Sequence, residues 1–273
     1  MSNDESKETC ETLLKIHSGK DFVLLTKRGN SAIRIAMQAL AHIGRSNVLY
    51  QEEGGWLTYK KFIEKANLNP IMLTTDDGLI ILGDLCNHPH DSALLINSMA
   101  GYAVLHDMDE ISGECFSHDI ILVNDVAGSI GTPNAKIGDI ILGSFGKAKP
   151  VDLGTGGFIA TNDPELFEFF KKNNDDYEES EIDFKILEQK LMDLEKRRTF
   201  LRERVEIIKK DLVDCKLVHP EGQGLNVIVR FSNEEEKEKI LSYCKSSKLE
   251  YTVCPREIRI LDDAISIEVK RLT

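Results

Sequence analysis

The chain has 273 residues, six cysteines and a formal net charge of −12. This length fits one large domain, or a large domain with a smaller partner, and allows a sizeable apolar core. The acidic balance argues against nucleic acid or an anionic membrane surface as a partner. The sequence shows no spanning apolar run, no signal peptide and no C-x-x-C pair. We therefore expect a cytoplasmic protein with free thiols.

Short apolar runs alternate with helical patterns through residue 165. Residues 21–26 predict a strand, and 30–44 predict a helix with one apolar face and an N-cap at Asn30 or Ser31. The same patterns predict a helix at 57–67, short strands near 70–74 and 79–82, and further strands at 47–51, 92–97, 119–125, 139–145 and 157–163. This alternation predicts an α/β fold with a mainly parallel sheet that is covered on both faces.

The pattern changes after residue 165. One long charged amphipathic helix is predicted over 183–213, and a small α+β unit follows, with strands near 226–231, 250–254 and 265–270 and a helix at 233–247. We therefore divide the chain into a large α/β domain, 1–165, and a C-terminal part, 166–273, made of the long helix and the small α+β domain. The acidic segment 173–184 predicts a solvated hinge.

Two of the predicted strands of the large domain end at positions that could bind a ligand. Gly29 permits a tight turn before a helix, and the exposed N–H groups of a helix N-terminus bind phosphate, although many such turns bind nothing. Asp125 ends an apolar strand, where α/β folds place their ligands. Its carboxylate can pair with a cationic ring nitrogen or simply cap a turn.

A third feature is the loop "SFGKAKPVDLGTGG" (144–157). Ser144 can donate to a phosphate, and Lys149 follows five residues later, either as a surface lysine or as a lysine that bonds to a cofactor. A phosphate cradle, a carboxylate at a strand end, a hydroxyl and a lysine together form the equipment of a pyridoxal-phosphate (PLP) enzyme.

The run "GDIILGSFGKAK" (138–149), with Asp125 before it and Gly156-Gly157 after it, resembles the DegT/DnrJ/StrS aminotransferases. These are fold-type I PLP-dependent enzymes that often act on sugar nucleotides. The resemblance covers 20–165 and implies a PLP fold-type I large domain. It implies that Lys149 forms the internal aldimine, with Lys147 as its neighbour, and that Asp125 pairs with the ring nitrogen.

The resemblance also implies how the rest of the cofactor is held. Gly29, Asn30, Ser31 and Ser144 match the positions that bind the phosphate, and Trp56, or else Tyr59, matches the aromatic residue that stacks on the ring. Trp56 fits a core position equally well. The implied protein is a homodimeric aminotransferase that uses a small-molecule amino donor and a keto acceptor, such as a sugar nucleotide or a related compound.

The sequence departs from the family pattern at three positions. Gly128 stands where a glutamine is usual, Pro150 where an asparagine is usual, and Thr155 where an acidic residue is usual. These departures keep two alternatives open. One is a non-catalytic or regulatory homologue, and the other is a different PLP reaction, such as that of a lyase or a decarboxylase.

Two further sets of residues have side chains that could act as ligands. Arg28, Arg256 and Arg259 are the arginines considered for a substrate carboxylate, and each also fits a solvated face. The stretch "CNHPH" (86–90) has metal-capable side chains but no second ligand cluster at a recognisable spacing, so we expect a polar loop there and no metal site.

Overall fold

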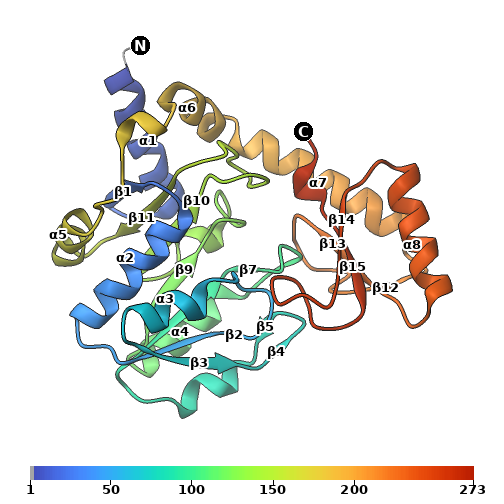
Figure 1. Cartoon of the computed structure of the whole chain (residues 1–273), viewed down its shortest axis with the longest axis horizontal. Coiled ribbons are helices and arrows are strands. Elements are labelled where there is room, and N and C mark those ends of the chain that lie inside the picture. Colours follow the sequence, from blue (N-terminus) through green and yellow to red (C-terminus); the bar gives the residue numbers. More distant parts are fainter. Residues whose placement is uncertain (1–2) are drawn as a thin grey trace.

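A seven-stranded sheet forms the centre of the larger part of the computed structural model, which describes residues 3–273 (Figure 1). Its strand order is β1-β11-β10-β9-β6-β2-β3, with β1 (Phe22–Thr26), β11 (Gly157–Thr161), β10 (Ile140–Ser144), β9 (Ile121–Asp125), β6 (Ser92–Asn97), β2 (Asn47–Gln51) and β3 (Asn69–Leu73). Strand β11 runs antiparallel to both of its neighbours, and the other pairs are parallel. The mainly parallel sheet confirms the predicted fold class.

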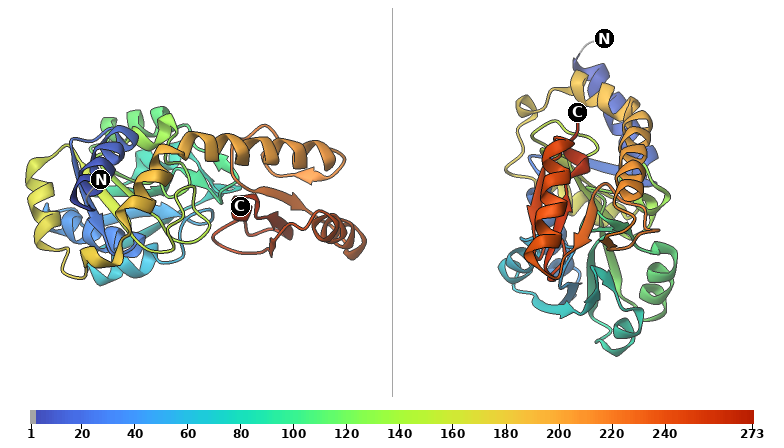
Figure 2. Two further views of the ribbon diagram at one scale, coloured as in Figure 1. Left: turned by 90° about the horizontal axis from the view of Figure 1, so that it is seen from above. Right: turned by 90° about the vertical axis from the view of Figure 1, so that its right-hand side faces the viewer.

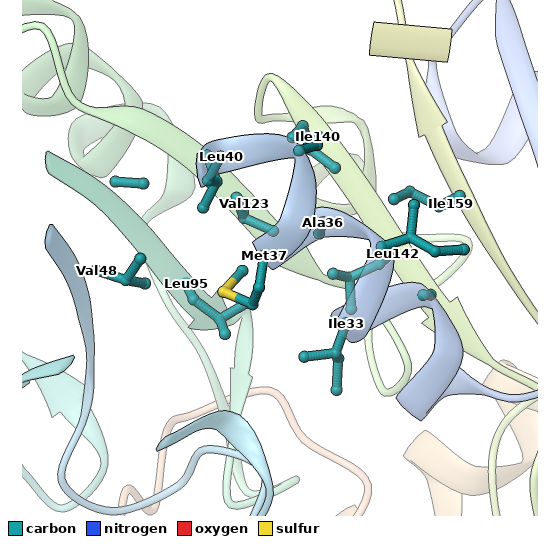
Figure 3. Close-up of a cluster of buried hydrophobic side chains, with 14 of the residues drawn as sticks. Ile33, Ala36, Met37, Leu40, Val48, Leu95, Val123, Ile140, Leu142 and Ile159 are labelled. Carbon is teal, nitrogen blue, oxygen red and sulfur yellow. The ribbon is translucent and has the colours of Figure 1, made fainter. Parts of the chain in front are cut away.

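Helices cover both faces of this sheet. One face carries α2 (Gly29–His42), α3 (Tyr59–Lys65) and α5 (Pro164–Lys172), and the other carries α1 (Asn3–Ser18), α4 (Met108–Ser117) and α6 (Phe184–Met192). Because successive side chains of a strand point to opposite faces, Ile140 and Leu142 pack under α2, whereas Ile141 packs toward α1 and α6. Figure 3 shows the α2 side of this core.

Helix α2 is held by its apolar stripe. Ala36, Met37 and Leu40 are fully buried against the sheet, and burial of each larger side chain contributes about 1.5–3 kcal/mol. The N-cap is Arg28, in extended backbone with no capping side-chain bond, so the expected cap at Asn30 or Ser31 was wrong. This end of the helix therefore keeps N–H groups without intrahelical partners.

A four-stranded sheet forms the smaller part of the molecule (Figure 2). Its order is β12-β13-β15-β14, with β12 (Lys216–Leu217), β13 (Val227–Arg230), β15 (Ala264–Ile267) and β14 (Tyr251–Val253), and its helix is α8 (Glu234–Ser246). Its core includes residues of α7 (Leu194–Asp211) and also Met99 and Tyr102 from the larger part. The two parts therefore share packed side chains.

The predicted helix 183–213 is two helices. Asp193 ends α6 and begins α7, and the two helices belong to different cores: Leu187 and Leu191 pack on the large sheet, and Leu201 packs on the small one. Helices α1 and α4 were not predicted, because their apolar stripes are short and lie among charged residues. Two small ribbons complete the fold, β4 (Thr75–Asp76) with β5 (Leu79–Ile80) and β7 (Met99–Ala100) with β8 (Val104–Leu105). Within residues 3–273, no helix is long and apolar enough to cross a bilayer.

Candidate functional site

A cavity of about 200 Å³ lies where several strands of the large sheet end. We call it the strand-end cavity. Asn97, Asp125 and Ser144 are the last residues of β6, β9 and β10, and all three line the cavity. Asn97 and Asp125 are neighbours because they are paired across β6 and β9. The N-terminus of α2 borders the same space. The other lining residues are Arg28, Gly29, Asn30, Ile33, Gly55, Trp56, Tyr102, Ala127, Leu142, Gly146, Lys147, Lys149, Gly154, Thr155, Gly156 and Ile258.

Lys149 is a buried lysine, with 8% of its surface exposed. Its Nζ donates a hydrogen bond to the Tyr102 hydroxyl and lies 5.1 Å from the centroid of the Trp56 ring. Lys147, two residues earlier in the same loop, is exposed. Both lysines line the cavity, but the structure separates them by burial, since Lys149 is buried and Lys147 is exposed.

Asp125 supplies a buried carboxylate to the same cavity. Its Oδ2 accepts a hydrogen bond of 2.8 Å from the Tyr59 hydroxyl, and its Oδ1 accepts one of 3.0 Å from the N–H of Ala127. Burial raises the pKa of Asp125, while these hydrogen bonds and the charge of Lys149 act in the opposite direction. Tyr59, the second aromatic candidate, thus lies behind Asp125 and is 1% exposed.

Backbone segments at the edge of the cavity approach one another too closely to leave room for side chains between them. A Cβ added at Gly29 would lie 2.7 Å from the Ser144 Cβ, and one at Gly157 would lie 2.7 Å from the Gly143 carbonyl oxygen and 2.8 Å from the Gly29 nitrogen. The start of α2, the end of β10 and the start of β11 therefore meet in contact, which requires glycine. The close approach places the N-terminus of α2 beside the Ser144 hydroxyl.

The structure brings most of the predicted site residues together, but not Ser31. The Asn30 Oδ1 accepts hydrogen bonds from Trp56 Nε1 (2.9 Å) and from the Thr58 hydroxyl (3.2 Å), so Asn30 fixes the indole at the rim. Ser31 does not line the cavity. Its buried hydroxyl donates to Asp176 Oδ2 at 2.6 Å, in the segment predicted as a solvated hinge.

Tyr102 is a site residue that the sequence did not identify. Its backbone has a φ of 63°, its ring is buried, and the ring centroid lies 4.6 Å from Lys149 Nζ and 4.2 Å from Lys270 Nζ. A Cβ at Gly128 would lie 2.9 Å from this ring. The glycine that departs from the family pattern thus makes room for Tyr102. Gly101-Tyr102 matches a turn of the family pattern, but the local sequence gives this pair no role.

The arginines considered for a substrate carboxylate lie in different surroundings. Arg28 lines the strand-end cavity, and Arg256 is exposed and lines a neighbouring cavity. Arg259 is buried and donates to both carboxylate oxygens of Glu268 at 2.8–3.0 Å. The charge of Arg259 is therefore already neutralised by the protein.

Cys86 lies beside two residues of α4 rather than beside the histidines of its own loop. Its Sγ is 3.8 Å from the Glu114 Oε2, which is 3.5 Å from the His118 Nε2. These three ligand atoms all lie within 4.8 Å of one another, so they could approach one metal ion. The cluster is on the surface, and none of its members lines the strand-end cavity.

A family model for the DegT/DnrJ/EryC1/StrS aminotransferase family matches residues 2–174, which includes the whole seven-stranded sheet. The chain belongs to this family. A second model, for the MJ1341 family C-terminal domain, matches residues 195–273, which span α7 and the four-stranded sheet. The family resemblance seen in the sequence is confirmed.

Solved structures show the same fold. An aminotransferase from Psychrobacter cryohalolentis matches with a TM-score of 0.78 at 15% identity, over 98% of this chain and 87% of the other. Helicobacter pylori PseC, an aminotransferase of pseudoaminic acid biosynthesis, matches with a TM-score of 0.76 at 15% identity, over 96% and 85%. An Escherichia coli GDP-4-keto-6-deoxy-D-mannose-3-dehydratase with bound hydrated PLP gives 0.75 at 16%, over 96% and 87%. These likenesses show that the chain has the fold of these enzymes.

Proposed function

We propose that the chain is a PLP-dependent aminotransferase whose cofactor occupies the strand-end cavity and is bonded to Lys149. The observation that carries the proposal is one small cavity that holds a buried lysine, a buried carboxylate and a helix N-terminus. The burial of two opposite charges without a direct ion pair is costly, and a ligand that carries the matching groups would offset that cost.

The residues present fit the parts of PLP. The N-terminus of α2, at Gly29 and Asn30, and the Ser144 hydroxyl would hold the phosphate, because Gly29 and Gly157 keep this wall free of side chains. The Asp125 carboxylate would face the ring nitrogen, and the Trp56 indole would cover one face of the ring. Ser31, by contrast, is engaged with Asp176 and would support the turn from behind.

Bound PLP supplies a pyridinium ring that accepts electrons from the substrate. Asp125 would hold a proton on the ring nitrogen, because a buried carboxylate stabilises a cation beside it. The Lys149 amine, once free, would act as the general acid–base group of the site, taking a proton from a carbon atom and returning it to another one nearby. The Tyr102 hydroxyl, bonded to Lys149 Nζ, would keep that amine in place.

The reaction assigned by this proposal is transfer of an amino group from a small-molecule donor to a keto acceptor, a sugar nucleotide or a related compound. Fold-type I sites usually lie beside a subunit interface, so we expect an isologous homodimer. Gly128 is compatible with a working site, because a Cβ there would lie 2.9 Å from the Tyr102 ring, and the hydroxyl of that ring accepts a hydrogen bond from Lys149.

The position of the covalent bond tests the proposal. The full chain is incubated with PLP, reduced with borohydride and digested, and the modified peptide is sequenced by mass spectrometry. We expect the label on Lys149, because its amine is buried in the cavity, and none on the exposed Lys147. A label on Lys147, or no label on the loop, would contradict the assignment.

Gly29→Ala tests the phosphate cradle. The new Cβ would lie 2.7 Å from the Ser144 Cβ, so the start of α2 or the end of β10 must shift. We expect PLP affinity, measured by fluorescence titration, to fall about tenfold or more, which corresponds to about 1.4 kcal/mol. Gly113→Ala is the matched control, since an added Cβ in α4 meets nothing within 4 Å and should stabilise the helix by up to about 1 kcal/mol. Equal PLP affinity in the two variants would exclude the cradle.

A further inference from the structure

The exposed thiol of Cys86 and the side chains of Glu114 and His118 form a group outside the strand-end cavity, which we call the Cys86 cluster. It brings a sulfur, a carboxylate oxygen and an imidazole nitrogen within 4.8 Å of one another. Thiolate, carboxylate and imidazole together are ligands that zinc accepts. The cluster therefore differs in kind from an acidic surface patch, in which every ligand is an oxygen.

The distances in the Cys86 cluster are close to those around a tetrahedral zinc ion. Zn–S bonds of about 2.3 Å and Zn–N and Zn–O bonds of about 2.0 Å place sulfur about 3.5 Å from oxygen, and oxygen about 3.3 Å from nitrogen. The Cys86 Sγ lies 3.8 Å from the Glu114 Oε2, which lies 3.5 Å from the His118 Nε2. Small rotations of these side chains would thus bring the three atoms to one ion.

Core packing holds the elements that carry the three ligands side by side. Glu114 and His118 are four residues apart on α4, so they share one face of the helix. Cys86 belongs to the 3₁₀ helix η1 (Leu82–Asn87), which contacts α4. Its neighbour Leu85 is fully buried, in the same core cluster as Ile111 of α4. The position of the thiol relative to α4 is therefore set by the apolar core beneath it.

Arg45 links the two chain segments that follow the ligands. Its Nη1 donates a hydrogen bond of 2.7 Å to the carbonyl oxygen of His90 and one of 2.6 Å to that of Asp119. His90 follows Cys86 by four residues, and Asp119 follows His118 directly. The Asp119 carboxylate also pairs with the Arg45 guanidinium at 3.2 Å, so this arginine does not place an unmatched positive charge beside the Cys86 cluster.

The C-terminal end of α4 favours a cation at this place. Helix α4 ends at Ser117, so Glu114 lies in its last turn and His118 is its C-cap. The last carbonyl groups of a helix carry a partial negative charge, which stabilises a nearby positive ion. The metal and the helix end therefore attract each other.

Local sequence does not reveal this set of ligands, because Glu114 lies 28 residues after Cys86. The expectation of a polar loop without a metal at 86–90 depended on the lack of a second ligand cluster at a recognisable spacing. The fold supplies the second group of ligands from α4, whose residues no short motif connects with the loop.

We propose that the Cys86 cluster binds one zinc ion, with water as the fourth ligand, and that the ion ties η1 to α4. The tie is structural, because the cluster lies at the opposite end of β9 from the strand-end cavity. His118 precedes the first residue of β9 by three positions, whereas Asp125 ends the strand at the cavity. A strand of this length spans on the order of 15 Å, which is too far for the metal to contact a group in the cavity. The inference is therefore independent of the proposed function.

Cobalt(II) titration tests the site, because cobalt occupies tetrahedral zinc sites and absorbs light. The full chain is used without added PLP, in a reductant that is not a thiol. We expect one ion per chain and a thiolate-to-cobalt charge-transfer band in the near ultraviolet, which zinc removes by displacing the cobalt. Cys86→Ser should abolish the band, and His118→Gln should weaken zinc binding by about 100-fold. Both side chains lie at the surface, so folding should be retained.

Cys215→Ser is the matched control, since Cys215 is a partly exposed thiol outside the Cys86 cluster, and it should keep both the band and the zinc affinity. No charge-transfer band, or a band that remains in Cys86→Ser, would overturn the site. Binding of several ions without the band would also overturn it, because exposed carboxylates alone would explain that result.

Thermal unfolding tests the tie between η1 and α4. At a zinc concentration roughly 100-fold above the Kd, we expect the Tm of the wild type and of Cys215→Ser to rise by about 5 °C, since the metal binds the folded chain. His118→Gln should show little rise at the same concentration. Zinc that binds at Cys86 but leaves the Tm of the wild type unchanged would overturn the structural role.

Discussion

Replacing Lys149 by alanine should lower amino-group transfer by on the order of 10³-fold or more, since one side chain supplies both the covalent bond and the proton transfer. The measurement is a single-turnover spectrum of the PLP-loaded chain with a panel of amino-acid donors. Dialysis should remove the cofactor from this variant faster than from the wild type, because the bond to the buried amine is lost and only the non-covalent contacts of the cavity remain. Lys149→Arg should behave in the same way, since it keeps the charge but lacks the amine.

Lys147→Ala is the matched control for this result. Lys147 lies two residues from Lys149 in the same loop, but its side chain is exposed. We expect its variant to retain PLP through dialysis and to change turnover by less than about tenfold. If Lys149→Ala kept full turnover while Lys147→Ala lost it, the roles of the two lysines would be reversed, and the buried position of Lys149 would need a structural explanation.

Asp125→Asn should lower turnover by on the order of 10²-fold or more, because a neutral amide cannot hold the proton on a ring nitrogen. Asparagine has nearly the shape of aspartate and can still accept a hydrogen bond from Tyr59 or from the Ala127 N–H, so PLP should still bind to Lys149. The measurement is again single-turnover kinetics, with the amount of bound cofactor determined separately. Turnover equal to that of the wild type would rule out this role for Asp125.

The same substitution should act differently on the protein without cofactor. Burial raises the pKa of Asp125 in the folded state, so the folded chain holds this proton more tightly than the unfolded chain. The charged carboxylate therefore opposes folding, and its contribution to stability falls as the pH rises from about 4, the pKa in an unfolded chain, through the folded pKa. At pH 7, cofactor-free Asp125→Asn should be at least as stable as the wild type in urea unfolding. A less stable variant would show that the hydrogen bonds from Tyr59 and Ala127 to the charged carboxylate stabilise the folded chain by more than burial of the charge destabilises it.

The chemistry of the candidate site was largely contained in local sequence. The strand ends at Asp125 and Ser144 follow from apolar runs bounded by polar residues, and the loop that holds Lys149 follows directly after one of them. Parallel strands place their carboxyl ends at one edge of a sheet, so side chains that follow such strands converge there. Local periodicity also predicted the α/β class. Apolar residues recur about every 3.6 residues along a helix and every two residues along a strand, and this spacing depends only on the backbone geometry of the element itself.

Only the tertiary structure decided the contacts between segments that are distant in sequence. It turned the Ser31 hydroxyl toward Asp176, 145 residues later, and it divided the predicted long helix at Asp193 between two cores. It also brought Tyr102 to Lys149 and gathered lysine and arginine side chains from several separate elements around a neighbouring cavity. No local sequence pattern predicts such contacts, because they depend on how the small sheet and its helices pack against the ends of the large sheet. The sequence by itself determined which residues could bind a cofactor, and packing decided which of them face the cavity and what surrounds them.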